Sequence, residues 1–192
     1  MDYYIEVQRI YTRMGEETSD KSLIGRPGRS AATILLLLLI LPCLLGLLGG
    51  SPLVTVLGFI TSILVLQGLA AAAGIGLGIP AFLLIPLMVS VAAGVDLGIY
   101  RICDLFSERS QRVAQQIGRV KELMDRHQTL RTYGEFMLIL IMWIPGFGLY
   151  GTPVVAWILQ WRGLRSILLM LTGWVIACLF VLGMAEGILA ML

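Results

Sequence analysis

Charged residues are scarce in this sequence of 192 residues. Only 14% of the residues are Asp, Glu, Lys or Arg, whereas 58% are hydrophobic and the mean hydropathy is +0.89. No lysine or arginine occurs from Ala31 to Tyr100. A water-soluble domain cannot hide so much apolar surface, so we expect a helical integral membrane protein with the lipid bilayer as its main partner. The formal net charge of +2 is too small to indicate nucleic acid as a partner.

Cysteine and histidine are also rare. The three cysteines, Cys43, Cys103 and Cys178, form no CxxC pair, and the single His127 has no Cys or His at metal-binding spacing. No Ser/His/Asp set, HExxH motif or paired carboxylate motif occurs. We therefore expect no enzymatic activity, no metal and no cofactor, and we expect cysteines inside apolar segments to behave as small hydrophobic residues.

The chain divides into polar and apolar stretches. Residues 1–30 are polar and carry aromatic and aliphatic residues at helical spacing, which predicts a cytoplasmic leader with a short amphipathic helix on the membrane surface. The remainder, 31–192, is predicted to be the membrane domain. Its predicted segments are a transmembrane helix at 31–48, a re-entrant hairpin at 53–78, a transmembrane helix at 79–100, a cytoplasmic amphipathic helix at 101–134, a second re-entrant hairpin at 135–161 and a transmembrane helix at 164–190.

The placement of positive charge is the reason for predicting hairpins rather than straight helices. Of the fourteen Lys and Arg residues, five precede Ser30, seven lie between Arg101 and Arg131, and two are Arg162 and Arg165. Five straight helices would put seven charges on each side, against the cytoplasmic excess expected of short loops. Two hairpins that enter from opposite sides bring all fourteen to the cytoplasm. The N-terminus is then cytoplasmic and the C-terminus outside, in a multi-pass protein of the cell membrane.

Proline and glycine break the second predicted hairpin between Pro145 and Pro153. Each leg has about nine residues, or roughly 14 Å of helix, against a hydrocarbon core of about 30 Å. Neither leg can cross alone. The predicted fold is thus an all-α inverted repeat of hairpin plus transmembrane helix, after one additional N-terminal helix. We expect the hairpin tips, near Gln67 and Tyr150, to meet close to the bilayer midplane and to enclose a polar, water-accessible pocket.

Several motifs in the second half resemble one membrane protein family. They are Arg131-Thr-Tyr-Gly134, Pro145-Gly-Phe-Gly-Leu-Tyr150-Gly-Thr152 and Ala156-Trp-Ile-Leu159, followed by Arg162 and Arg165. This pattern resembles the small multidrug export protein family, which is similar to the DedA or VTT superfamily. The resemblance implies two facing re-entrant hairpins, and ion-coupled transport or lipid translocation.

The first half departs from the pattern of that family. Where the family has a Glu-Leu-Arg-Gly-Ala-Ile-Pro run, this chain has Val65, Gln67 and Ala71 in place of the acid, the base and the proline. In the second half, Phe147 replaces a common threonine. These departures leave open whether the chain couples transport differently, scrambles lipid passively or has lost transport.

The candidate site residues are the polar and ionisable groups inside the apolar segments, because burying such groups in a membrane is costly without a role or a partner. For substrate binding between the tips we predict Gln67, Gly146, Gly148, Tyr150 and Thr152, although glycines at such positions serve helix packing about as often. For proton or ion coupling the candidates are Asp96, Glu135 and Glu186. For anionic head groups at the cytoplasmic side they are Arg162 and Arg165.

Three functions fit these features: a small secondary transporter of a small molecule or ion, a lipid translocator or scramblase on the same scaffold, and a membrane subunit that anchors partners without transport. The transporter is the favoured interpretation, because broken helices in inverted repeats are typical of transporter binding sites. The sequence leaves the substrate, the coupling ion and homo-oligomerisation open.

Overall fold

The computed structural model describes residues 27–109, 134–144, 146–161 and 163–189, and these residues form helices joined by turns, with no strand among them. The predicted helix of the leader and most of the predicted amphipathic helix at 101–134 lie outside the described residues. The elements are α2 (Pro27–Leu35), η1 (Leu36–Ile40), α3 (Leu41–Leu48), α4 (Leu53–Leu66), η2 (Gln67–Leu69), α5 (Ala70–Gly76), α6 (Ala81–Arg109), η3 (Gly134–Phe136), α9 (Met137–Ile141), α10 (Gly148–Ile158) and α11 (Leu164–Leu189).

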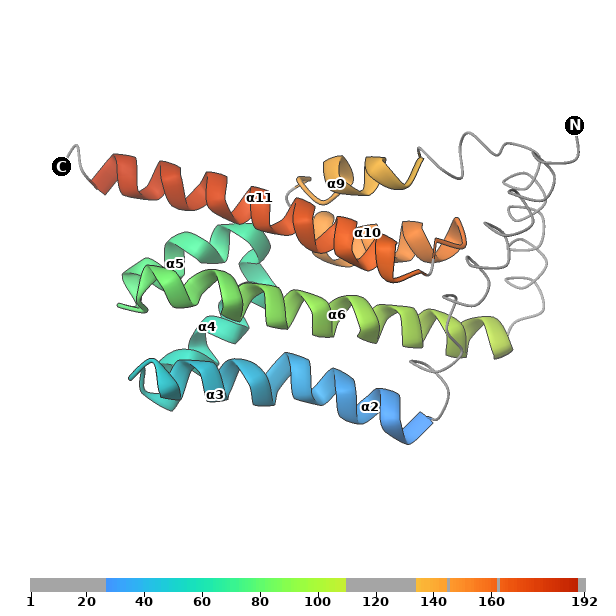
Figure 1. Ribbon diagram of the computed structural model, residues 1–192, viewed down its shortest axis with the longest axis horizontal. Helices are drawn as coiled ribbons and strands as arrows, with labels where there is room; N and C mark the ends of the chain where they lie inside the picture. The colour runs from blue at the N-terminus through green and yellow to red at the C-terminus, as the bar shows by residue number, and fades with distance from the viewer. Residues whose placement is uncertain (1–26, 110–133, 145, 162, 190–192) are drawn as a thin grey trace, which may run out of the picture.

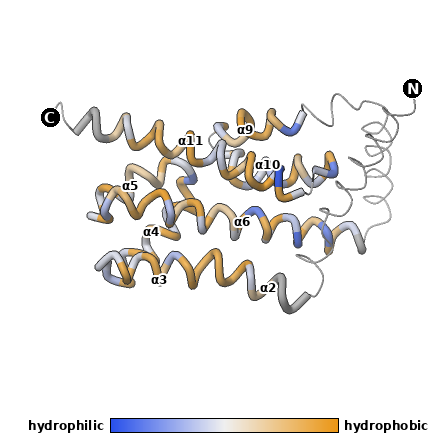
Figure 2. The backbone as a smooth tube through the Cα atoms, viewed as in Figure 1, coloured by the Kyte–Doolittle hydropathy of each residue, from blue (hydrophilic) through white to orange (hydrophobic). Residues whose placement is uncertain are grey.

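Four of the described helical stretches are long and apolar enough to cross a membrane: Ala31–Leu48, Leu53–Gly76, Ala81–Ser107 and Leu164–Ala185. Hydrophobic residues dominate these stretches in Figure 2. The structure confirms the prediction of an all-helical chain whose helices are compatible with a membrane protein.

The third long helix, α6, is central to the bundle and contacts most other elements (Figure 1). Its end was predicted at Tyr100, but α6 continues to Arg109 and has 29 residues. A helix of that length extends about 44 Å, more than the roughly 30 Å of a hydrocarbon core. The sequence prediction stopped too early because it followed hydropathy, whereas a helix can continue past the apolar stretch.

The first long helix contains a π-helical turn, η1, just before a proline. Because Pro42 has no N–H, the regular hydrogen-bond ladder cannot continue through it. The Leu41 N–H bonds to the Leu36 carbonyl, five residues back, and the hydroxyl of Ser90 on α6 donates to the Leu37 carbonyl at 2.6 Å. A side chain of α6 thus satisfies a backbone acceptor at this irregular turn. Gly94 allows the close approach, since a Cβ there would lie 2.9 Å from the Leu38 nitrogen.

The segment from α4 to α5 folds back on itself. At Gln67 the backbone turns sharply, with φ 55° and ψ −126°. A Cβ on Gly74 of α5 would lie 2.7 Å from the Phe59 ring of α4, although these residues would be about 22 Å apart in one straight helix. Gly49 precedes this segment and Leu83 follows it, and a Cβ on Gly49 would meet the Leu83 side chain. The segment therefore starts and ends at the same end of the molecule, on the left in Figure 1.

The segment from η3 to α10 also folds back. Its start and end lie together, since a Cβ on Gly134 would lie 2.7 Å from the Trp161 ring. Between α9 and α10 the chain reverses through a loop in which Gly146 has φ 82°, a value that favours glycine. This segment opens toward the opposite end of the molecule from the first, on the right in Figure 1.

Candidate functional site

The reversals of the two folded segments contact each other through two hydrogen bonds. The Gly146 N–H donates to Gln67 Oε1 at 3.1 Å, and the Tyr150 hydroxyl donates to the Leu64 carbonyl. The prediction that the regions of Gln67 and Tyr150 meet is therefore confirmed, across 79 and 86 residues of sequence respectively. Each bond joins a side chain of one segment to the backbone of the other.

The turn at Gln67 explains why these bonds form. Helix α4 ends there, and the last carbonyls of a helix have no donor within it, so the Leu64 carbonyl is free to accept from Tyr150. Gln67 is not a glycine, yet its φ is positive, a conformation that costs about 1–3 kcal/mol and persists where the surroundings enforce it. The side chain of Gln67 is buried and caps the turn at Gly146.

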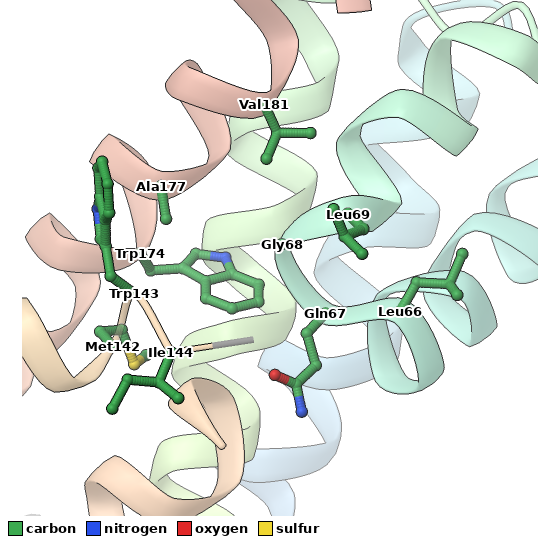
Figure 3. A pocket seen from close by; sticks show the side chains of 10 residues that line it. All are labelled: Leu66, Gln67, Gly68, Leu69, Met142, Trp143, Ile144, Trp174, Ala177 and Val181. Atoms are coloured by element: carbon green, nitrogen blue, oxygen red, sulfur yellow. The ribbon is translucent and has the colours of Figure 1, made fainter. Parts of the chain in front are cut away.

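A cavity of about 60 Å³ lies beside this contact (Figure 3). One wall is the turn after α4, another is the loop after α9, and the third is the face of α11 that carries Trp174. The residues that line the cavity are Leu66, Gln67, Gly68, Leu69, Met142, Trp143, Ile144, Trp174, Ala177 and Val181.

The prediction of a polar pocket at the tips is wrong for this cavity. Its wall is mainly aliphatic and aromatic, and Gln67 is its one amide side chain. Of the five predicted binding residues only Gln67 lines it. Sequence reasoning missed Trp143 and Trp174, because a tryptophan in an apolar helix is indistinguishable by pattern from a lipid-facing or core residue.

The other predicted binding residues lie at or near the second reversal, between α9 and α10, and do not line the cavity. Gly148 begins α10 against the preceding turn, since a Cβ there would lie 2.2 Å from the Met142 carbonyl oxygen. Tyr150 is exposed over 38% of its surface. Thr152 is fully buried, and its hydroxyl has no hydrogen-bond partner.

Asp96 is the most unusual ionisable residue that the structure describes. Its side chain has no exposed surface, and neither carboxyl oxygen has a hydrogen-bond partner. It shares one face of α6 with Tyr100 and Asp104, which follow at spacings of four. That face meets the end of α10, because the Tyr100 hydroxyl donates to the Trp161 carbonyl at 3.2 Å and Trp157 Nε1 donates to Asp104 Oδ1 at 2.8 Å.

The other predicted coupling residues differ from Asp96. Glu135 lies 3.5 Å from Arg165 Nε, and the Arg165 guanidinium also lies 5.4 Å from the centre of the Phe136 ring. This ion pair joins the start of the second segment to the start of α11. Glu186 belongs to α11, but its side chain, like Arg162, lies outside the described residues. Among the residues that the structure does describe, no group of three or more His, Cys, Asp or Glu is placed to hold a metal ion.

Comparison of the chain with models of known protein families, with characterised proteins and with solved structures gives no match.

Proposed function

We propose that this chain is a small membrane transporter in which two re-entrant hairpins, Leu53–Gly76 and the segment from η3 to α10, meet inside the bilayer and form the site of passage. The observation that carries the proposal is the contact of the two reversals through Gln67 with Gly146 and Tyr150 with Leu64. Broken helices that meet in pairs place unpaired backbone groups where a substrate can bind, as in many secondary transporters. The motif resemblance of the second half supports the same class.

The charge distribution supports the re-entrant arrangement. The two segments open toward opposite ends of the molecule (Figure 1), so neither has to cross the bilayer for the chain to connect its neighbouring helices. All fourteen Lys and Arg residues then lie on the cytoplasmic side, together with the N-terminus, and the C-terminus lies outside. The chain is in this proposal a multi-pass protein of the cell membrane.

Asp96 is the residue that we propose for proton or ion coupling. A buried carboxylate with no partner is costly in a membrane, so the group is expected to be neutral and protonated in the structure described. Gaining or losing that proton changes the charge at the α6 face that contacts α10, the helix that begins just after the second reversal. Glu135 is less suited to this role because Arg165 already neutralises it.

Proton movement can be measured without knowing the substrate. Purified protein is reconstituted into vesicles that contain the pH-sensitive dye pyranine, and a potassium gradient with valinomycin sets the membrane potential. We expect a faster change of internal pH than in protein-free vesicles, and a return to the protein-free rate in Asp96→Asn. Asp104→Asn is the matched control, because it changes another carboxylate of the same helix face and should keep the flux. Equal rates with and without protein contradict proton movement by this chain.

Lipid translocation is the second candidate, and the position of the cavity favours it. Four residues of its wall are 45–56% exposed on the apolar surface of the bundle: Leu66, Leu69, Trp143 and Ile144. A lipid chain could enter a cavity with such a rim directly from the bilayer. Vesicles with a fluorescent lipid in both leaflets distinguish this function: dithionite quenches about half of the fluorescence if lipids stay in their leaflets, and nearly all of it if the protein scrambles them.

A further inference from the structure

We propose that Gln67 and Tyr150 form a latch between the two reversals, and that release of its two hydrogen bonds opens the cavity beside them. The inference rests on the proposed function for the use of the opening, which is the passage of a substrate. The latch itself rests on the geometry of the contact, so it can be tested without a substrate. The structure described is then the closed state.

The helices of the two folded segments have little other contact with each other. Among the described elements, η2, α5 and α9 pack on α11, and α10 packs on α6, but no helix of one segment packs extensively on a helix of the other. In the described part of the chain, the bonds from Gly146 to Gln67 and from Tyr150 to Leu64 join the two reversals. Both bonds can therefore break while each segment stays packed on α6 and α11.

The backbone of Gln67 indicates that its side chain has a role. With φ 55° and ψ −126°, it has a conformation that glycine adopts readily and that is strained for a residue with a Cβ. Strained residues of this kind are frequent at clamps and switches. Glycine would avoid the strain, but it would lack the amide oxygen that accepts from Gly146. In Figure 3 this oxygen lies on the side of Ile144, near the second reversal.

Release of the latch would change the cavity directly. The turn after α4 and the loop after α9 are two of its walls, and Gln67 itself lines it. A volume of about 60 Å³ holds only a few non-hydrogen atoms, so the closed state has no room for a typical substrate. Leu66 and Ile144 lie on these two walls and are 46% and 50% exposed. Separation of the walls would therefore widen the cavity and open it toward the surface of the bundle.

The chain offers a matched control for each half of the latch. Gln160 also has a positive φ, 61°, and its amide donates to the Trp157 carbonyl three residues back. Gln67→Gly and Gln160→Gly thus relieve the same kind of strain, but only the first removes a latch bond. Tyr150→Phe and Tyr100→Phe each remove one hydroxyl bond to a backbone carbonyl, and only the first of these bonds belongs to the latch.

Pulsed electron paramagnetic resonance measures the separation of the reversals directly. Spin labels are attached through Val65→Cys and Leu140→Cys in the full chain, without its three native cysteines, in nanodiscs. These two side chains are 72% and 69% exposed, and neither lines the cavity. We expect a short distance to dominate in the parent. The ratio of a longer distance to the short one should rise about two- to tenfold in Gln67→Gly and in Tyr150→Phe, because each loses one neutral hydrogen bond.

The double variant should show a larger rise than either single one, and the two control variants should match the parent. Distance distributions that neither latch variant changes would overturn the latch, and so would an equal change in the controls. If Gln67→Gly fails to fold, Tyr150→Phe and its control still decide the matter.

Flux in the pyranine assay separates the latch from the proposed function. A longer distance in the latch variants, without flux in any variant, would reject transport and keep the latch. Flux in the parent with unchanged distances in both latch variants would reject the latch and keep transport.

Discussion

Replacement of Gly94 by alanine should separate the first long helix, which contains Leu38, from α6. The added methyl group would lie 2.9 Å from the Leu38 nitrogen and 3.0 Å from its Cα, where ordinary contacts between such atoms are about 3.5–4.0 Å. Because the obstructing atoms belong to the backbone, the two helices must move apart by several tenths of an ångström. The Ser90 hydroxyl bond to Leu37, one turn away along α6, would then lengthen from 2.6 Å.

The magnitude follows from three contributions. Overpacking of a tight contact costs about 1–3 kcal/mol, and a weakened hydrogen bond costs up to about 1 kcal/mol. Alanine regains about 1 kcal/mol of helix propensity over glycine. The net destabilisation is about 0–3 kcal/mol, which corresponds to a fall in Tm of up to roughly 12 °C for a chain of this size.

Thermal unfolding of the purified protein in detergent, followed by gel filtration of the remaining folded fraction, measures this change. Gly98→Ala is the matched control on the same helix, because its nearest atom would be Ile34 Cγ2 at 3.7 Å, an ordinary contact. We expect Gly98→Ala to raise the Tm slightly and Gly94→Ala to lower it. The close-approach explanation is refuted if both substitutions change Tm in the same direction by the same amount.

Three other substitutions test separate contacts by the same unfolding assay. Ser90→Ala should cost about 1–3 kcal/mol, because the Leu37 carbonyl loses the only donor that the structure shows for it outside its own helix; an unchanged Tm would mean that the hydroxyl is dispensable. Gly148→Ala should destabilise the second reversal by about 1–3 kcal/mol, since a backbone oxygen lies 2.2 Å from the new methyl group; a stabilised variant would contradict that geometry. Trp157→Phe replaces the buried indole by a smaller phenyl ring and removes the 2.8 Å bond to Asp104, so we expect a loss of about 1.5–3 kcal/mol from the bond and a further loss from packing; an unchanged Tm would show that the bond adds nothing.

Hydropathy alone was enough to predict long apolar helices that are compatible with a membrane protein, because a segment in lipid has to pair its own backbone polar groups and present apolar side chains. The second reversal could also be predicted from the sequence, since the prolines and glycines between Pro145 and Pro153 interrupt helices directly. The contact of Gln67 with the second segment was expected from charge placement and leg length together.

Other features had no sequence signal. The π-helical turn depends on how Pro42 is accommodated, and its partner Ser90 is an ordinary serine 53 residues away along the chain. The cavity depends on the packing of Trp174 between two reversals, which a pattern of apolar residues does not encode. Asp96 was recognisable as an acid inside an apolar segment, but its burial and the absence of any partner for its carboxyl group are three-dimensional facts.

The sidedness of the two folded segments is the most direct test of the proposed architecture. Single cysteines at Pro52, Gly78, Gly134 and Leu164, in a chain without its three native cysteines, are treated in intact cells with a membrane-impermeant maleimide. The account predicts that positions 52 and 78 are both labelled from outside, and that positions 134 and 164 are labelled only after the cells are permeabilised. Labelling of position 52 without position 78 would mean that Leu53–Gly76 crosses the bilayer, and the re-entrant architecture would be wrong.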